Sequence, residues 1–173
     1  MLYGFDGRNP LIGQESYVSE TALVLGDVKI GNNCYIGHGA IVRGDYGSIV
    51  IGSGTAVEEG VIMHAPPKEA LLVGERVTIG HGAIIHAAKV GDLSVIGMGA
   101  ILSIRSEVGK RAIVAEGAVV KMGQVIPDEV VAGGNPARVL RKVTKKDIDH
   151  WDWGKALYID LARKYLSGAM EKL

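Results

Sequence analysis

Histidine is a common ligand of zinc-type metal ions, and three of the five histidines in this chain lie close together in the sequence. They are His64, His81 and His86, separated by 17 and then by 5 residues. This spacing fits no metal-binding motif of a single helix, such as H-E-x-x-H, which places two histidines on one helical face. A shared metal site therefore depends on how the rest of the chain brings these three side chains together.

The overall composition argues against a nucleic-acid or membrane partner. The 173 residues carry 19 basic and 19 acidic side chains, so the chain lacks the basic surplus that binds phosphate backbones or anionic lipids. No apolar run approaches the roughly 20 residues that span a bilayer. The first residues lack the basic and then apolar stretch of a signal peptide, and Cys34, the single cysteine, has no disulfide partner within the chain. We therefore expect a cytoplasmic protein.

A six-residue period runs through most of the chain. Aliphatic side chains recur at every sixth residue, with two longer interruptions and one five-residue step. The side chain two residues earlier is usually small, and glycine often follows the aliphatic residue directly. The aliphatic positions are Ile12, Val18, Val24, Ile30, Ile36, Val42, Ile51, Val57, Met63, Val73, Ile79, Ile85, Val90, Ile96, Leu102, Val108, Val114, Val120 and Ile126.

A period of six is neither the 3.6 of a helix nor the 2 of a simple strand. It resembles the hexapeptide-repeat, left-handed parallel β-helix family, in which three hexads form one triangular coil. The large side chain fills the coil interior, the small one fits near a corner, and glycine permits the sharp turn. Cys34 occupies a small interior position, so we interpret it as a core residue and not as a nucleophile. The hexads predict about six coils, stacked about 4.8 Å apart.

The repeat ends near Pro127, and the remaining sequence is of a different kind. Thr144 followed by Asp147 has the pattern of a capping box that opens a helix, which Gly154 could kink or split. Such a helix would cover one face of the β-helix and pack both Trp151 and Trp153 there. We therefore expect a mainly β fold, with a left-handed β-helix domain in residues 1–140 and a C-terminal helical segment in residues 141–173 packed on it.

The hexad register places the three histidines in space. His64 and His86 each follow a hexad start on the same face, one coil apart, so their rings should stack about 4.8 Å apart. His81 comes two residues after Ile79 and belongs to the preceding face. In a threefold oligomer, one face of each subunit meets a different face of its neighbour, and His81 of one chain could complete the pair of another. The spacing therefore predicts a homotrimer as well as a metal.

Charged residues accompany the histidines in the same register. Arg43 lies one coil before His64, and we expect it to pair with Asp45, because an unpaired guanidinium beside a dication is unfavourable. Glu58 and Glu59 lie on the face of His81, one coil earlier, and would be carried toward the same junction.

Several stretches together resemble the γ-class carbonic anhydrase family of hexapeptide proteins. They are Arg43-Gly44-Asp45-Tyr46-Gly47, Val61-Ile62-Met63-His64, Ile79-Gly80-His81-Gly82-Ala83-Ile84-Ile85-His86 and Gly133-Gly134-Asn135-Pro136-Ala137. The resemblance implies a homotrimer with a three-histidine metal at each interface, and it makes His64, His81 and His86 the ligands. The implied cofactor is Zn²⁺, with Fe²⁺ or Co²⁺ as alternatives. The implied activity is that of a zinc-dependent lyase of the carbonate dehydratase type, in which a metal-bound hydroxide attacks CO2.

The chain departs from the family pattern at several positions near the metal. Glu58 stands where the family has a glutamine that orients the metal-bound water, and it could accept a proton or bind the metal as a fourth ligand. Ala56 replaces a nearby asparagine, and the short loop at residues 65–70 offers only Glu69 as a proton shuttle. Tyr158 matches a helix tyrosine that approaches the metal in short-loop relatives, although packing is the favoured interpretation of this residue. Residues 103–106 read Ser-Ile-Arg-Ser in place of Leu-Asp-Gly-Ala.

Other functions are compatible with the same sequence. A three-histidine site could hydrolyse an acyl-CoA thioester as well as hydrate CO2. A hexapeptide acyltransferase or a non-catalytic metal-binding protein is a further alternative, but acyltransferases of this fold use a single histidine base and no metal. The remaining histidines fit structural positions, with His38 solvated or hydrogen-bonded and His150 on a helix surface.

Overall fold

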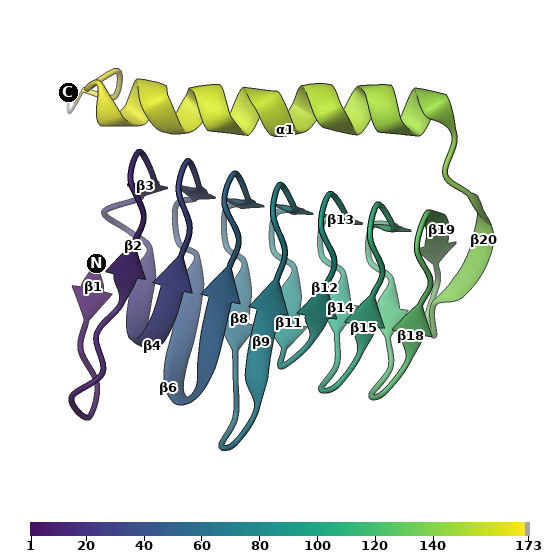
Figure 1. The fold of residues 1–173 in the computed structure, drawn as a ribbon, viewed down its shortest axis with the longest axis horizontal. Helices are drawn as coiled ribbons and strands as arrows, with labels where there is room; N and C mark the ends of the chain where they lie inside the picture. The colour runs from purple at the N-terminus through teal and green to yellow at the C-terminus, as the bar shows by residue number, and fades with distance from the viewer. Residues whose placement is uncertain (172–173) are drawn as a thin grey trace.

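The computed structural model describes residues 1–171 as a three-sided parallel β-helix with one long helix, α1, along its outside (Figure 1). Two sheets make up the coils, one of 12 and one of 8 strands within the described residues. The fold is the expected left-handed β-helix of the hexapeptide-repeat type. Residues 172–173, the end of the expected helical segment 141–173, lie outside the described part of the chain.

The 8-stranded sheet forms the face beneath α1, which we call the helix-covered face. Its strands follow one another from coil to coil in parallel, and the last one turns back antiparallel. They are β3 (Tyr17–Val18), β5 (Tyr35–Ile36), β7 (Ala56–Val57), β10 (Thr78–Ile79), β13 (Val95–Ile96), β16 (Ile113–Val114), β19 (Val130–Gly133) and β20 (Arg138–Lys142).

The 12-stranded sheet wraps around the other two faces, because β4 (Leu23–Ile30) and β6 (Ile41–Ile51) continue from one face to the next. The first parts of β4 and β6 begin the histidine face, which continues with β8 (Ile62–His64), β11 (Ile84–His86), β14 (Ile101–Leu102) and β17 (Val119–Val120). The third face contains β2 (Leu11–Ile12), the later parts of β4 and β6, β9 (Ala70–Val73), β12 (Lys89–Val90), β15 (Glu107–Val108) and β18 (Val125–Ile126), while β1 (Leu2–Tyr3) pairs with β4.

The hexad positions form a continuous core inside the coils. Val57, Ile79 and Ile96 are fully enclosed and stand directly above one another in the strand register. Cys34 is also fully buried within this core, which confirms its interpretation as an interior residue. The six-residue period therefore reflects one inward aliphatic side chain on each of three faces.

Glycine after the aliphatic residue serves a different purpose from the one expected. A Cβ atom at Gly31 would lie 2.6 Å from the backbone nitrogen of Ser53, and one at Gly52 would lie 2.5 Å from the carbonyl carbon of Gly74. These glycines are needed because neighbouring coils approach closely at the corner. The left-handed turns are made by other glycines, such as Gly60 (φ 69°) and Gly82 (φ 68°).

The stack of coils is longer than the hexads predict. The helix-covered face has seven parallel strands, because β19 adds a rung in register with β16. The expectation that the repeat ends near Pro127 was therefore wrong by part of a coil. Small Ala132 takes the inward position beside Val114, which hides this rung from a search for large aliphatic residues. The loop between β8 and β9 protrudes as expected (Figure 1).

Helix α1 (Lys145–Leu166) runs back along the helix-covered face from the last coil toward the first (Figure 1). Its predicted capping box is confirmed, since the Thr144 side chain accepts from the Asp147 backbone and Asp147 accepts from the Thr144 backbone. The helix is continuous through Gly154, so the expected kink is absent from its described residues. Trp151 lies toward the sheet, but Trp153 is 61% exposed and does not pack there, because two residues along a helix rotate a side chain by about 200°.

The described part of the chain contains no helix with both the length and the apolar character needed to cross a bilayer.

Candidate metal centre

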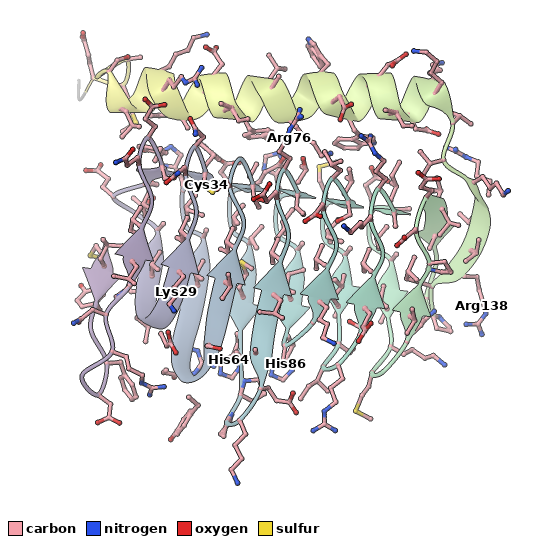
Figure 2. All side chains as sticks on the ribbon, in the orientation of Figure 1. Lys29, Cys34, His64, Arg76, His86 and Arg138 are labelled. Carbon is pink, nitrogen blue, oxygen red and sulfur yellow. The ribbon has the colours of Figure 1, made fainter. Side chains whose placement is uncertain are left out.

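His64 and His86 form a stacked pair at one edge of the histidine face. They end β8 and β11, and the two residues are direct partners in the parallel register. Their ring centroids lie 5.2 Å apart with an angle of 12° between the rings. Figure 2 shows both side chains next to each other on the side of the molecule away from α1. The predicted stacking of this pair is confirmed.

Arg43 and Asp45 stand beside this pair, as the register predicts. An Arg43 Nη1 donates to Asp45 Oδ2 at 2.6 Å, and the other carboxylate oxygen lies 3.4 Å from His64 Nε2. Burial alone would raise the pKa of Asp45, but the hydrogen bond and charge of Arg43 hold this pKa below its usual value. Asp45 is therefore an ionised carboxylate with one oxygen turned toward the histidine pair.

His64 has the properties that a metal ligand needs. Burial and the nearby Arg43 charge lower the pKa of His64, so its imidazole is neutral, as metal binding requires. Its Nε2 atom is buried and makes no hydrogen bond within the described residues. A buried ring nitrogen without a partner is costly unless something binds it. This atom, with the parallel His86 ring next to it, fits a zinc-type ion.

His81 lies at the opposite edge of the histidine face, in the turn between β10 and β11. Its Nδ1 atom is 2.7 Å from Glu59 Oε2, and its Nε2 atom is 3.1 Å from Glu58 Oε2. When Nδ1 donates its proton to Glu59, Nε2 carries a lone pair that faces Glu58. The Nε2 lone pair and the Glu58 oxygen, 3.1 Å apart, repel each other unless a proton or a cation lies near them. His81 therefore presents Nε2 as a candidate ligand atom at the corner, beside Glu58.

Glu58 is a buried carboxylate with several contacts at this corner. Its Oε2 atom accepts a hydrogen bond from the His81 backbone N–H at 3.1 Å. Burial raises the pKa of Glu58, although the neighbouring His81 and the Tyr158 hydroxyl oppose this change. Burial and the neighbouring Glu58 charge raise the pKa of Tyr158. Tyr158 thus lies against Glu58, where it can hold or pass a proton.

The three histidines do not converge within one subunit. Residues 1–171 contain no group of three or more histidine, cysteine, aspartate or glutamate side chains arranged to hold a metal ion. The stacked pair and His81 occupy the two opposite edges of one face, so each edge carries part of a ligand set. This is the arrangement predicted for a centre that two subunits share, and the donor atoms on each edge fit that use.

Sequence reasoning missed two contacts that involve these residues. The Tyr35 hydroxyl donates to Glu59 Oε1 at 2.6 Å, so a tyrosine from a third coil holds the acid that orients His81. Glu69, the one acid that the short loop offers as a proton shuttle, accepts from Arg105 at 2.5 and 2.8 Å. The departure at residues 103–106 marked Arg105 as unusual for the family, but it did not identify Glu69 as the partner of Arg105. The predicted hydrogen bonding of His38 is confirmed, because its Nδ1 atom lies 2.7 Å from the Ser19 hydroxyl oxygen.

The fold and the paired edges define the class of protein, and comparison with known proteins agrees with it. Residues 9–44 match a model described as bacterial transferase hexapeptide (six repeats). A putative acetyltransferase structure from Bacillus cereus superposes with a TM-score of 0.95 at 29% identity, covering 96% of this chain and 97% of that one. The chain is thus a hexapeptide-repeat β-helix protein of the kind that carries a C-terminal helix.

Sequence relatives narrow the assignment. The chain is 36% identical to carnitine operon protein CaiE of Salmonella agona, over 98% of this chain and 85% of the relative. It is 37% identical to gamma carbonic anhydrase 2, mitochondrial, of Arabidopsis thaliana, over 92% of this chain and 60% of the relative. The chain spans about three fifths of the length of such plant relatives. It belongs to the γ-class carbonic anhydrase-like family of hexapeptide-repeat proteins.

Proposed function

We propose that this chain is a metal-dependent enzyme of the γ-class carbonic anhydrase type that hydrates CO2 at the interfaces of a homotrimer. The observation that carries the proposal is the placement of His64 and His86 at one edge of a face and of His81 at the other. A site divided in this way is complete only when one subunit's edge meets the opposite edge of a neighbour. Such a heterologous contact closes into a ring when the rotation between subunits is threefold.

The surface between the two edges supports this assembly. One outward aliphatic side chain per coil stands in register along the histidine face. Ile62, Ile84 and Ile101 are 41%, 40% and 37% exposed. This row of apolar side chains lies between the histidines at the two edges of the face, and it is the kind of surface that an oligomer buries. We infer that it packs against the neighbouring subunit.

His64 and His86 of one subunit and His81 of the next would hold the ion, with Zn²⁺ preferred and Fe²⁺ or Co²⁺ as alternatives. Bound by three neutral imidazoles, such an ion supplies an acidified water, and thus a nucleophile, at neutral pH. Glu59 holds the proton of His81 on Nδ1, which leaves Nε2 for the ligand bond. Asp45, fixed by Arg43, places a negative charge beside His64.

Glu58 is the residue that we assign to proton acceptance. Its raised pKa brings the carboxylate closer to neutral pH, where a general base is most effective. The His81 backbone N–H already binds its Oε2 atom, which favours a fixed base over a fourth metal ligand. The Tyr158 hydroxyl lies against the same carboxylate and can steady it or pass the proton outward.

A second candidate function is hydrolysis of an acyl-CoA thioester at the same centre. A hollow of about 260 Å³ adjoins Glu58 and His81, and its walls include Met98, Trp153 and Leu157. We call it the edge hollow. CO2 needs no such apolar space, whereas an acyl group could occupy it, and the kinship with a carnitine operon protein points the same way. Acyltransferase activity is less well supported, because one histidine base would leave the other two ligand-placed histidines without a role.

A reducing cytoplasm is the setting that we infer, since Cys34 is a free thiol enclosed in the core.

Metal analysis of protein purified without a histidine tag is the first test. The proposal predicts about one ion per subunit in the wild type and near-complete loss in His81→Ala. Protein that is folded and metal-free, or a His81→Ala variant with the same metal content as wild type, would refute the metal centre.

Parallel CO2-hydration and thioesterase assays then separate the two reactions. Glu58→Gln should keep its metal. The reaction that the enzyme catalyses, whether CO2 hydration or thioester hydrolysis, should slow by about a hundredfold or more, as removal of a general base does. A rise in CO2 hydration in this variant would instead show that Glu58 quenches the metal as a ligand. Loss of thioesterase activity alone would favour the second candidate.

A further inference from the structure

Lys155 is a buried amine that the proposed metal centre does not use. The residue is 1% exposed on the inner side of α1. Its Nζ atom has no hydrogen-bond partner anywhere in residues 1–171 and lies 5.5 Å from the centre of the Trp151 ring. The Trp151 ring is a favourable but weak partner for an ammonium group, and without a paired anion the buried charge remains costly. The position therefore favours a lysine that is neutral or chemically modified.

The neighbours of α1 show where this amine lies on the sheet. Tyr158 packs on Tyr35 of β5 at 5.3 Å between ring centroids, whereas Trp151 reaches the side chains of β13 and β16. Lys155 stands between these two aromatic residues on the same side of the helix, and so it lies over β7 and β10. Thr78 of β10 is 2% exposed, and its hydroxyl also lacks a partner within the described residues. Two unused polar groups thus share this part of the buried layer.

The charges of Asp152, Arg76 and Arg111 act on Lys155. The Arg76 side chain passes close to α1. A Cβ atom placed on Gly54 would lie 3.1 Å from Arg76 Cγ and 3.5 Å from Ile159 Cδ1, a side chain of the helix. Figure 2 shows Arg76 directly beneath the middle of the helix. Arg111 lies 3.8 Å from Asp152, which is the nearby carboxylate. Burial is the main cause that lowers the pKa of Lys155 to about 8. The charge of Asp152 opposes this change, and the smaller effects of the Arg76 and Arg111 charges add to it.

The edge hollow lies next to this layer, although Lys155 itself does not line it. Thr78, Trp151, Gly154 and Tyr158 line it under the helix, and Glu58 and His81 line it at the corner. These residues flank Lys155 along the helix and below it. The volume of about 260 Å³ is ample for a triatomic ligand.

We propose that Lys155 is a carbamylation site, at which the neutral amine binds CO2 covalently. The Nζ lone pair forms a bond to the carbon of CO2, and one C–O π pair moves onto oxygen. The amine then releases one proton to water, which leaves an N-carboxylate of net charge −1. Arg76 and Arg111 provide the positive charge that this anion needs, and the Thr78 hydroxyl can donate to it. The proposal does not depend on the metal centre or on its reaction.

The experiment uses the intact protein with ¹³C-labelled bicarbonate at about pH 8. Carbamates are trapped by alkylation with triethyloxonium and are then located by peptide mass spectrometry. Trapping at Lys155 should exceed that at the exposed amines of Lys145 and Lys164 by about tenfold or more, because burial lowers the pKa of the Lys155 amine. Absence of label at Lys155, or equal label at all three lysines, would overturn the proposal.

Two variants test the site itself. Lys155→Met keeps the length of the side chain and should abolish the label without loss of fold. Thr78→Val keeps the side-chain shape and should lower trapping at Lys155 by about fivefold, the effect of one hydrogen bond of about 1 kcal/mol. The wild-type melting temperature should rise with added CO2, whereas that of Lys155→Met should not. An equal rise in both proteins would mean that CO2 acts elsewhere, and if Lys155→Met fails to fold, the wild-type peptide map decides alone.

Discussion

In the proposed centre, Glu59 determines which nitrogen of His81 faces the metal. It accepts a hydrogen bond from Nδ1 at 2.7 Å and is itself held by the Tyr35 hydroxyl at 2.6 Å. Although burial would raise the pKa of Glu59, the hydrogen bond from Tyr35 helps to hold it below its usual value. An ionised carboxylate is therefore available to orient the imidazole, as outer partners of metal-bound histidines generally do.

This contact predicts a loss of affinity when the carboxylate is removed. Glu59→Gln should weaken metal binding by about 10- to 100-fold while leaving the fold intact, because the amide no longer favours one tautomer of His81. Competition titration with a chromophoric chelator measures the change. Glu116→Gln is a matched control, since Glu116 is an exposed acid at the same hexad position three coils further along. Equal affinities for Glu59→Gln and wild type would contradict the assigned role.

Residue types and hexad positions were enough to predict the stacked histidine pair and the ion pair of Arg43 with Asp45. Both follow from register alone, since residues one coil apart must lie side by side. The contact of Tyr35 with Glu59 and the pairing of Glu69 with Arg105 could not be predicted in this way. These depend on how long side chains turn after leaving the backbone, and the repeat does not constrain that choice.

The capping box of α1 stabilises the element that covers the sheet. Asp147 accepts from the Thr144 backbone and pairs with Arg141 at 2.6 Å, and hydrogen bonds from Arg141 and Thr144 hold its pKa well below the usual range. A carboxyl whose pKa is lower in the folded state stabilises the fold above the unfolded pKa of about 4. That stabilisation is lost as the pH falls from this value toward the lowered pKa.

Asp147→Asn should therefore lower the free energy of unfolding at pH 7, and the difference from wild type should shrink progressively below about pH 4. Thr144→Ala should cost about 1 kcal/mol, the usual loss for an N-cap. Urea denaturation at several pH values measures both effects. Asp149→Asn serves as the control, because its ion pair with Lys145 is on the exposed side of the same helix. A difference for Asp147→Asn that stayed constant down to pH 3 would show that its charge is not involved.

At the level of elements, the sequence predicted the three-sided stack and the start of α1 but not the rotation of the helix on the sheet. A capping box indicates where a helix begins, whereas the inward residues depend on packing with the coils below. This is why Trp153 was wrongly placed against the sheet and the burial of Lys155 was not foreseen. The extra rung at β19 was missed because its inward residue is alanine.

The whole molecule has two uncovered faces of different character. The histidine face carries the row of isoleucines, and the third face carries Leu72, which is exposed to the same extent as Ile84. Assembly through the histidine face predicts that Ile84→Glu dissociates the trimer and removes its metal, because a buried unpaired charge is strongly unfavourable. Leu72→Glu should change neither property. Light scattering with parallel metal analysis measures both, and dissociation by Leu72→Glu instead would place the interface on the third face.

Sharing of the metal centre between subunits is tested most directly by mixed trimers. One variant lacks His81, and the other lacks both His64 and His86, so neither can form a complete site on its own. When the two are co-expressed at equal levels, a heterologous interface predicts that about one quarter of the sites regain three histidines and bind metal. The predicted result is metal in the mixed protein and almost none in either variant alone. Mixed trimers as empty as the two separate variants would contradict the account.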